Sequence, residues 1–498
     1  PDFLQHRGFS IDRIISHSFL STEGILGIPI AISSTFIFLF LMFGVILTKT
    51  GLEEYFTDLA MSMTGWMTGG TAKVGVLTSV FSGMITGSSV ANTVGNGAFT
   101  IPMMKRSGYK PEFAAAVEAA SSTGGQITPP VMGSAAFLMI EFTGIPYVDI
   151  VKAAIVPALL FFTAQFIIVH YQSKKWGITG VPRSKLKKLS TLIVKQGYLL
   201  LPIAAIIYML SIGRSPMRAA LSGIAMSLGV NILVMMVAFL FGKYQNVKYK
   251  LTPKVFFEIL EESARSALPV ISACACAGII VGVITLTGLG LRVAGGIINL
   301  AGGILVLTMF FTMISSIILG MGLPTTANYV ITATMAAPAL LELGVPVIAA
   351  HLFVFYFGIV ADITPPVALA SYAGAGIAKS NPFETSLWSV KIAVGAFLVP
   401  YMFVLSPQLL LIDVTYLGFG AALFTAILGM ACIGTAVVGF IETKINLPIR
   451  IILGIAGISL LYAQWITDIV GLTIFLAVFI HQKVIMRRIK RAKAEEEA

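Results

Sequence analysis

Long apolar segments alternate with short polar loops along almost the whole chain. About 20 apolar residues are enough to cross a bilayer as a helix, and shorter pairs can enter and leave the membrane on one side as re-entrant hairpins. The pattern therefore predicts an all-α polytopic membrane protein with eleven crossings and two re-entrant helical hairpins. The predicted crossings lie near 27–48, 112–141, 153–171, 196–213, 216–241, 268–288, 346–373, 388–411, 415–440, 449–464 and 468–484, and the hairpins near 74–104 and 304–341.

Three further stretches mix apolar and charged positions in the manner of amphipathic helices. They lie at 52–72, 252–267 and 289–303. Helices of this kind place their apolar side at the boundary between headgroups and acyl chains. We therefore expect these three stretches to lie along the membrane surface.

One pentapeptide occurs twice. Ile-Thr-Pro-Pro-Val fills 127–131 and again 363–367, an offset of 236 residues that also pairs Asn92 with Asn328. Agreement in one register indicates an internal duplication. A Pro-Pro pair removes two amide donors and clashes with the preceding turn, so each copy is predicted to break a transmembrane helix. Matched breaks in two halves indicate the binding site of a secondary transporter, because broken backbone at membrane depth survives only inside protein or beside a watery cavity.

Basic residues are concentrated on one side of the predicted membrane. Of the 33 Lys and Arg residues, 27 lie on one side and 6 on the other. The positive-inside rule makes the first side cytoplasmic, and the basic C-terminal tail lies there. An odd number of crossings separates the two breaks, so the duplication is predicted to be an inverted repeat. The chain is 57% apolar and 11% charged, which excludes an ordinary soluble protein, and its net charge of +11 reflects topology rather than a nucleic-acid surface.

The duplication divides the chain into five predicted regions. They are an N-terminal segment (1–23), the first repeat (24–172), a connector with two transmembrane helices (173–251), the second repeat (252–411), and C-terminal transmembrane helices with the basic tail (412–498). The chain begins at Pro1 without an initiator Met, and we expect further sequence upstream.

Each predicted hairpin carries a glycine-rich turn followed by two hydroxyl residues and an asparagine. Glycine allows a sharp turn and close approach of a ligand, hydroxyl and amide oxygens with helix-end carbonyls suit a small cation, and helix N-termini attract an anion. Small residues also let membrane helices pack tightly, but two tips in register with two breaks favour a binding site. The residues are Ser88, Ser89 and Asn92 in the first tip and Thr325, Thr326 and Asn328 in the second.

One carboxylate, Asp362, is predicted to lie at mid-depth beside the second break. An intramembrane acid is a functional candidate, and Asp362 could ligate a cation, carry a proton or cap a helix end. Glu118 lies in the first broken crossing and is expected to pack or to line a polar cavity. No Lys or Arg falls at the tips or breaks, so dipoles, hydroxyls, asparagines and a bound cation would have to hold an anionic substrate. No metal-ligand spacing, nucleotide loop or nucleophile–base grouping occurs, so we expect no enzyme, no cofactor, and no metal beyond a coupling cation.

These motifs resemble the large membrane subunit of tripartite ATP-independent periplasmic (TRAP) transporters, in particular the fused 4TM/12TM permeases that work with TAXI-type binding proteins. The resemblance covers about 24–411, and the segment beyond Thr415 looks like the C-terminal extension of the fused type. The matching stretches are 88–92, 100–105, 118–126, 129–133, 322–329 and 363–370.

The resemblance implies an elevator-type transporter of the bacterial inner membrane. It would import a small organic acid delivered by a periplasmic TAXI-type binding protein, driven by Na⁺ or alternatively by H⁺. A small four-helix membrane subunit, absent from this chain, is expected upstream or as a separate polypeptide. Residues matching the family's cation site are Ser88, Asn92, Gly125, Thr128, Thr325, Asn328, Asp362 and Thr364. Those expected at the substrate are Ser89, Asn92, Thr326, Asn328, Pro130 and Pro366.

Three alternatives remain open on the sequence alone. A sodium/dicarboxylate-type symporter would share the architecture but need no binding protein. A polytopic membrane enzyme would cluster acids or histidines at one membrane face, whereas the polar residues here cluster at mid-depth. A channel is disfavoured because hairpins from both faces would block a continuous pore.

Overall fold

The computed structural model describes residues 8–133, 135–461 and 465–496. Over these residues the regular structure is helical, apart from an isolated antiparallel bridge between Phe440 and Lys444. Eight helical stretches in this part of the chain are long and apolar enough to cross a membrane. These are Ile28–Lys49, Tyr147–Lys175, Arg183–Ser211, Pro216–Leu240, Pro253–Thr287, Pro382–Leu405, Tyr416–Val438 and Trp465–Arg488. The predicted class, an all-α polytopic membrane protein, is confirmed.

The α-helices occur in the following order along the chain. Up to the connector they are α1 (Ile11–Phe19), α2 (Ile28–Ile32), α3 (Phe38–Lys49), α4 (Leu52–Thr64), α5 (Gly70–Thr86), α6 (Ser89–Arg106), α7 (Pro111–Gly125), α8 (Ala135–Thr143) and α9 (Tyr147–Lys175). The connector contains α10 (Leu189–Gln196), α11 (Leu201–Ser211) and α12 (Pro216–Leu240). Then come α13 (Pro253–Thr287), α14 (Leu289–Leu300), α15 (Leu305–Gly320), α16 (Thr325–Met335), α17 (Ala337–Leu341), α18 (Val347–Val360), α19 (Leu369–Ala378), α20 (Pro382–Ile392), α21 (Val394–Leu405), α22 (Tyr416–Val438), α23 (Leu447–Ser459) and α24 (Trp465–Glu496).

The order of helices in the first half recurs in the second. Six helix starts recur within two residues of the 236-residue offset of the pentapeptide. The starts of α4 to α9 are Leu52, Gly70, Ser89, Pro111, Ala135 and Tyr147, and their counterparts in α14, α15, α16, α18, α19 and α20 are Leu289, Leu305, Thr325, Val347, Leu369 and Pro382.

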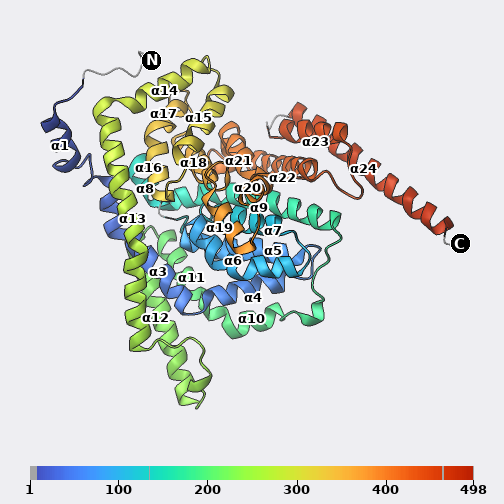
Figure 1. Cartoon of the computed structure of the whole chain (residues 1–498), viewed down its shortest axis with the longest axis horizontal. Coiled ribbons are helices and arrows are strands. Elements are labelled where there is room, and N and C mark those ends of the chain that lie inside the picture. Colours follow the sequence, from blue (N-terminus) through green and yellow to red (C-terminus); the bar gives the residue numbers. More distant parts are fainter. Residues whose placement is uncertain (1–7, 134, 462–464, 497–498) are drawn as a thin grey trace.

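Helices α5, α6 and α7 pack against one another at the centre of the molecule (Figure 1). Every residue of α7 from Phe113 to Gly125 is buried, and every residue of α18 from Ile348 to Val360 is buried as well. The run in α7 is mostly Ala, Ser and Gly. Small side chains let membrane helices approach closely, so α7 can be surrounded on all sides.

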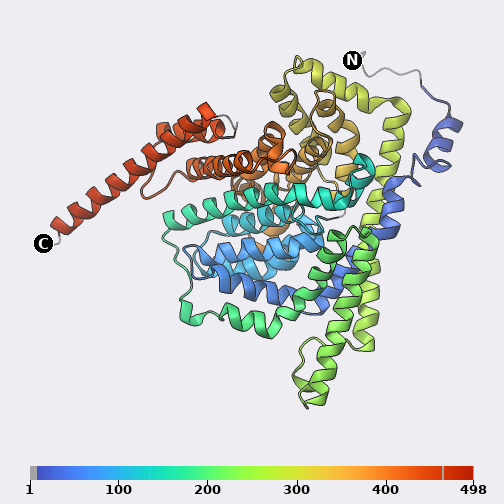
Figure 2. The same ribbon diagram turned by 180° about the vertical axis from the view of Figure 1, so that it is seen from behind.

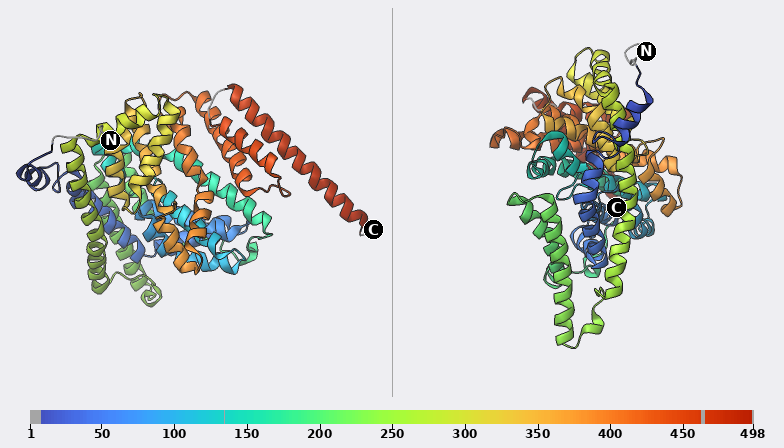
Figure 3. Two further views of the ribbon diagram at one scale, coloured as in Figure 1. Left: turned by 45° about the horizontal axis from the view of Figure 1, so that its top comes forward. Right: turned by 90° about the vertical axis from the view of Figure 1, so that its left-hand side faces the viewer.

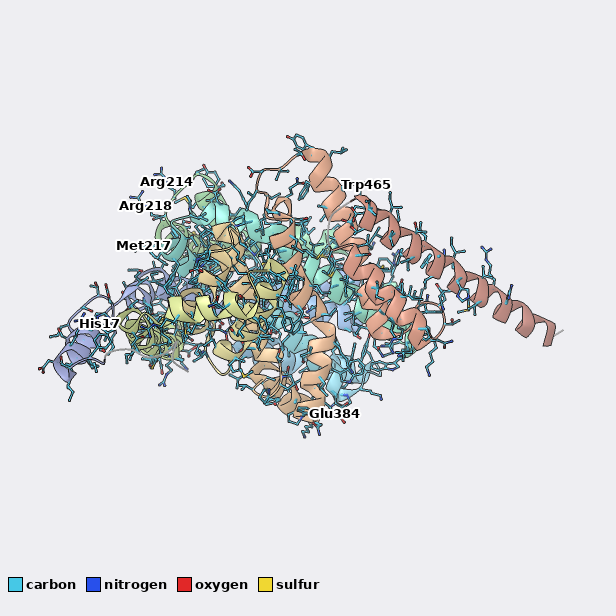
Figure 4. The ribbon with its side chains drawn as sticks, turned by 90° about the horizontal axis from the view of Figure 1, so that it is seen from above. His17, Arg214, Met217, Arg218, Glu384 and Trp465 are labelled. Atoms are coloured by element: carbon cyan, nitrogen blue, oxygen red, sulfur yellow. The ribbon has the colours of Figure 1, made fainter. Side chains whose placement is uncertain are left out.

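Two groups of helices lie on opposite sides of this centre. Helices α12 and α13 lie along one side and reach beyond the body, while α23 and α24 lie on the other (Figures 1 and 2). The membrane-length window of α24 is only 11% buried, and the helix projects away from the rest (Figure 3). Figure 4 places Arg214, Arg218 and Glu384 at the periphery, as expected for charges in loops and at helix starts.

One predicted boundary is wrong. The sequence predicts a separate surface helix over 252–267, but this stretch continues without a break into the crossing at 268–288 as the 35-residue helix α13. Its buried positions Ile259, Ser263 and Ala267 recur every four residues, so one face stays in contact through Pro269. Packing along this face outweighs the one hydrogen bond that a proline removes.

Candidate functional site

The tips of the two helical hairpins line one cavity of about 510 Å³. The α5–α6 hairpin contributes Gly87 to Ala91, and the α15–α16 hairpin contributes Gly322 to Thr326. Asp362 and Gly133, which follow the interrupted helices, line the same cavity. The structure thus brings segments from both halves of the chain together around one space.

Glycine shapes the first tip. Helix α5 ends at Thr86, and Gly87 follows with φ of 63°. A Cβ atom at Gly87 would lie 2.3 Å from the Cα of Gly133, so only glycine allows the tip to contact the segment after α7. Ser88 then caps α6, because its side chain accepts a hydrogen bond from the backbone N–H of Ala91 at 3.3 Å.

Both proline pairs lie where a helix is interrupted. Helix α7 ends at Gly125 and α8 begins at Ala135, while α18 ends at Val360 and α19 begins at Leu369. The Pro129–Pro130 and Pro365–Pro366 peptide bonds are both cis. Loss of two amide donors in succession explains why the helix does not continue through either pair.

Two of the hydrogen bonds that cross between the halves are copies of one another. Ser89 Oγ in the first tip donates to Asp362 Oδ2 beyond α18 at 2.5 Å. Thr325 Oγ1 in the second tip donates to Gln126 Oε1 beyond α7 at 2.6 Å. The same 236-residue offset that relates the pentapeptides relates Ser89 to Thr325 and Gln126 to Asp362. Each tip therefore binds the interrupted segment of the opposite half.

Sequence reasoning missed Gln126. It is fully buried, and it occupies the position in the first half that Asp362 occupies in the second. The repeat offset of 236 residues could have identified Gln126, because it pairs Gln126 with Asp362, a candidate already identified from the sequence. The polarity of a side chain in a turn does not by itself indicate a contact with the other half.

The two predicted asparagines lie behind the tips rather than on the cavity wall. Asn92 Nδ2 donates to Ser79 O at 3.0 Å and to Ser122 Oγ at 3.1 Å, which joins α6 to α5 and α7. Asn328 Nδ2 donates to Gly358 O at 2.7 Å and Gly320 O at 3.4 Å, which joins α16 to α18 and α15. Both asparagines are 2% exposed. Each therefore connects the arms of a hairpin to the interrupted helix that follows it.

The remaining predicted residues divide between the cavity wall and its support. Thr128 Oγ1 donates to Gly124 O at 2.9 Å, and Thr364 Oγ1 donates to Val360 O at 2.8 Å, so both threonines close the last turn of their helices. Gly125 packs directly on Gly83. Ser88, Ser89, Thr325, Thr326 and Asp362 line the cavity, whereas Asn92, Gly125, Thr128, Asn328, Thr364, Pro130 and Pro366 do not.

The carbonyl oxygens of the second prolines are held in the same way in both halves. Tyr147 Oη donates to Pro130 O at 2.8 Å, and Tyr372 Oη donates to Pro366 O at 2.6 Å. These contacts satisfy carbonyl groups that the interrupted helices leave without a helical partner.

The opposite wall of the cavity comes from α3 and α13. Phe40, Gly44 and Thr48 lie on α3, and Glu262 and Ser266 lie on α13. Glu262 is ion-paired with Lys49 at 2.8 Å. Among the described residues that line the cavity, Asp362 and Glu262 are the ionisable ones, and both are acids. The cavity wall therefore offers hydroxyl, carboxylate and backbone oxygens.

Glu118 lies behind the cavity. Its carboxylate is fully buried and accepts hydrogen bonds from Ser79, Thr100 and Ser122, on α5, α6 and α7 respectively. Three hydroxyl donors satisfy a buried carboxylate that has no basic partner in the described ion pairs. Glu118 thus connects the three central helices and does not line the cavity.

A polytopic helical protein with two hairpin tips around one cavity that both halves of the chain line has the features of a membrane permease. The family described as "Tripartite ATP-independent periplasmic transporter, DctM component" matches residues 6–417. The chain belongs to this family, whose members are transporter permeases rather than enzymes.

Named relatives share about a quarter of their residues with this chain. The isethionate TRAP transporter permease of Oleidesulfovibrio alaskensis is 24% identical over 374 residues, which is 74% of this chain and 55% of that protein. The sialic acid TRAP transporter large permease of Vibrio cholerae is 24% identical over 385 residues, covering 76% of this chain and 86% of its own length. The C4-dicarboxylate TRAP transporter large permease of Pseudomonas aeruginosa is 24% identical over 370 residues, covering 73% and 82%.

Proposed function

We propose that this chain is the large membrane subunit of a TRAP importer that carries a small organic carboxylate into the cell, coupled to Na⁺. The relatives are named for isethionate, sialic acid and C4-dicarboxylates, all of them acidic solutes. The observation that carries the proposal is the crossed pairing of tips and interrupted segments at one cavity. A site formed by both halves of an inverted repeat can be exposed to one side of the membrane or to the other, as alternating access requires.

The proposed mechanism is an elevator. The hairpins α5–α6 and α15–α16 are re-entrant, α7–α8 and α18–α19 are broken transmembrane helices, and together they form the moving body of an inverted repeat. Helices α3 and α13, which form the opposite wall of the cavity, belong to the stationary scaffold. The recurrence of helix starts in the two halves supports this division.

The acidic cavity supports coupling to a cation. Glu262 is paired with Lys49, but a carboxylate substrate would meet Asp362 with no Lys or Arg among the described lining residues. Two anions close together in a site of low dielectric repel each other strongly. A bound Na⁺ removes this repulsion, and the hydroxyls of Ser88, Thr325 and the carboxylate of Asp362 are oxygens of the kind it requires. The backbone and side chains of Asn92, Gly125, Thr128, Asn328 and Thr364 hold these groups in place or complete the coordination.

The substrate is proposed to contact the other hydroxyls of the tips, Ser89 and Thr326. Pro130 and Pro366 fix the turns that bring the broken helix ends toward the cavity, with Asn92 and Asn328 behind the tips. Delivery of the substrate depends on a periplasmic binding protein of the TAXI type. The complex also includes a small four-helix membrane subunit. The chain lies in the bacterial inner membrane with its C-terminus in the cytoplasm, as its basic tail indicates.

The test is uptake by proteoliposomes that contain the complete permease, its small subunit and the binding protein. Separately imposed gradients of Na⁺ and H⁺ distinguish the coupling ion. We expect uptake that requires both the binding protein and an inward Na⁺ gradient. Uptake at the same rate without the binding protein would instead identify a symporter of the sodium/dicarboxylate type, and uptake driven only by a proton gradient would replace Na⁺ by H⁺.

A further inference from the structure

A second cavity of about 400 Å³ lies between α4, the start of α11 and the last turns of α12. It shares no lining residue with the cavity between the hairpin tips. Its walls include Tyr55 of α4, Gln196 at the end of α10 and Asn231 of α12. None of its lining residues is assigned a role in the transport mechanism proposed above.

Three buried polar atoms on this wall have no hydrogen-bond partner among the described residues. They are Tyr55 Oη, Gln196 Oε1 and Asn231 Oδ1. Tyr55 is 1% exposed and Asn231 is 9% exposed. Buried polar atoms left without a partner lower stability, so three around one cavity indicate a ligand that supplies partners.

The missing partner of Asn231 is a hydrogen-bond donor. Asn231 Nδ2 donates to Tyr249 O at 3.2 Å, which fixes the orientation of the amide and leaves its carbonyl oxygen unpaired. Gln196 Oε1 is also an acceptor. A ligand that carries an ammonium group or hydroxyls satisfies both oxygens.

The cavity also carries one uncompensated positive charge. Glu54 accepts hydrogen bonds from Lys248 Nζ at 2.6 Å and Tyr249 Oη at 2.7 Å, and these bonds lower the pKa of Glu54, so this acid and base neutralise each other. Lys195 lines the cavity and forms no ion pair among the described residues. An anionic group beside the hydrogen-bond donor therefore suits the wall.

The rest of the wall is apolar and lies at the end of membrane-length helices. Leu199 in the turn before α11, Pro202 in the first turn of α11, and Val230 and Val234 of α12 line it. The membrane-length windows that contain α11 and α12 are each only 22% buried within the protein. Apolar helices with so little protein around them face lipid.

We propose that this cavity binds the headgroup of a glycerophospholipid whose phosphate is followed by a hydrogen-bond donor, as in phosphatidylethanolamine or phosphatidylglycerol. The phosphate pairs with Lys195, and the ammonium or glycerol hydroxyls donate to Gln196 Oε1 and Asn231 Oδ1. The acyl chains follow Leu199, Val230 and Val234 toward the outer sides of α11 and α12. Phosphatidylcholine has no N–H or O–H group in its headgroup and does not satisfy the two amide oxygens.

The experiment titrates the delipidated full chain in detergent with phosphatidylethanolamine, phosphatidylglycerol and phosphatidylcholine of the same acyl chains, and counts bound lipid by native mass spectrometry. We expect the first two lipids to bind at least about fivefold more tightly than phosphatidylcholine. Asn231→Leu and Gln196→Leu should remove the preference. Gln245→Leu, an exposed amide on the same connector, should retain it.

Two further arms keep the outcome decisive. Lys195→Gln changes an exposed residue, should not affect folding, and should weaken binding of both favoured lipids severalfold even if a buried variant misfolds. Soluble glycerophosphoethanolamine should bind far more weakly than the lipid, because it lacks acyl chains. Equal binding of phosphatidylcholine, a preference that survives in Asn231→Leu, undiminished lipid binding by Lys195→Gln, or tight binding of the soluble headgroup would overturn the proposal.

Discussion

At the scale of single residues, the centre of the site is one hydrogen bond made twice. Ser89 donates to Asp362, and Thr325 donates to Gln126 at the equivalent position. The geometry is shared, but one acceptor is a carboxylate and the other an amide. A hydrogen bond to a charged group contributes about 1.5–3 kcal/mol, against about 0.5–1.5 kcal/mol for a neutral pair. The two copies therefore differ in strength and in charge.

Asp362→Asn should retain the size of the side chain and remove its charge. We expect initial uptake to fall about tenfold or more, since each factor of ten corresponds to about 1.4 kcal/mol, and we expect the apparent affinity for Na⁺ to weaken. Uptake measured against external Na⁺ gives both values. Exchange of the two acceptors, Asp362→Gln with Gln126→Asp, tests whether the acid works from either position. An unchanged Na⁺ profile in Asp362→Asn would assign this acid to structure alone.

Ser89→Ala and Thr325→Val each remove one of the crossed hydrogen bonds. Ser89→Ala leaves a buried carboxylate with one donor fewer, so it should destabilise the protein about 1 kcal/mol more than Thr325→Val does. Thermal unfolding in detergent, followed by loss of helical circular dichroism, measures the difference. Equal shifts for the two variants would mean that the charge on Asp362 is compensated elsewhere.

The site could be predicted from the sequence only in part. Ser89, Thr325 and Asp362 are identifiable because hydroxyls after glycine and an acid within an apolar segment are unusual locally. Gln126 was missed because its role depends on a contact with residues in the other half. The lining of α3 and α13 was missed for the same reason, since Phe40, Glu262 and their neighbours follow ordinary helical patterns.

At the scale of elements, the hairpin tips depend on close backbone contacts. Gly87 has a left-handed conformation and touches Gly133, while Gly95 in the following helix has open space around it. An added Cβ atom would therefore collide with backbone at Gly87 but find open space at Gly95, on the same hairpin.

Gly87→Ala should destabilise the protein by about 2 kcal/mol or more and abolish uptake, because the added Cβ collides with backbone and the φ angle is unfavourable. Gly95→Ala should be neutral or stabilise by up to about 1 kcal/mol, since alanine favours a helix. Melting temperatures of the two variants, with uptake assays, make the comparison. A Gly87→Ala variant as stable and active as Gly95→Ala would contradict the contact between the tip and Gly133.

Asn92→Ala and Asn328→Ala remove the donors that join each hairpin to the next helix. We expect each to cost about 1–3 kcal/mol, because carbonyl groups of the neighbouring helix ends lose their partner. Uptake should be lost, while insertion into the membrane continues. Asn299→Ala, at an exposed position on α14, is the control. Full uptake by either buried variant would remove that asparagine from the machinery of the site.

Element boundaries are predictable where the backbone itself imposes them. Both Pro-Pro pairs lie where their helices end, since two missing donors cannot be compensated by packing. The single Pro269 has no such effect, and α13 continues through it because its small and apolar face stays in contact. The local loss of two backbone donors thus ends the helices at the Pro-Pro pairs, whereas tertiary packing lets α13 continue through Pro269.

At the scale of the whole molecule, the cavity lies between two groups of helices rather than within one. The tips and Asp362 form one wall, and α3 and α13 form the other. In the proposed elevator, one group moves against the other across this boundary, so a covalent link across it should stop transport.

Leu323→Cys with Val270→Cys places one thiol on each wall, in a background where Cys274, Cys276 and Cys432 are replaced by Ser. A bifunctional maleimide should abolish most of the uptake by the pair and leave each single variant nearly unaffected. Gel mobility and mass spectrometry verify the link. Normal uptake by the linked protein would exclude sliding of the tips along α13.

The unequal acceptors at equivalent positions have a consequence for the bound molecule. Two matching halves alone would offer a guest two identical poses related by a rotation, with no means of choosing between them. Asp362 lies on the cavity wall, whereas its counterpart Gln126 is buried behind it, so the two halves present different charges to the cavity. In the proposed importer, this difference would turn the charged end of the substrate the same way on every cycle.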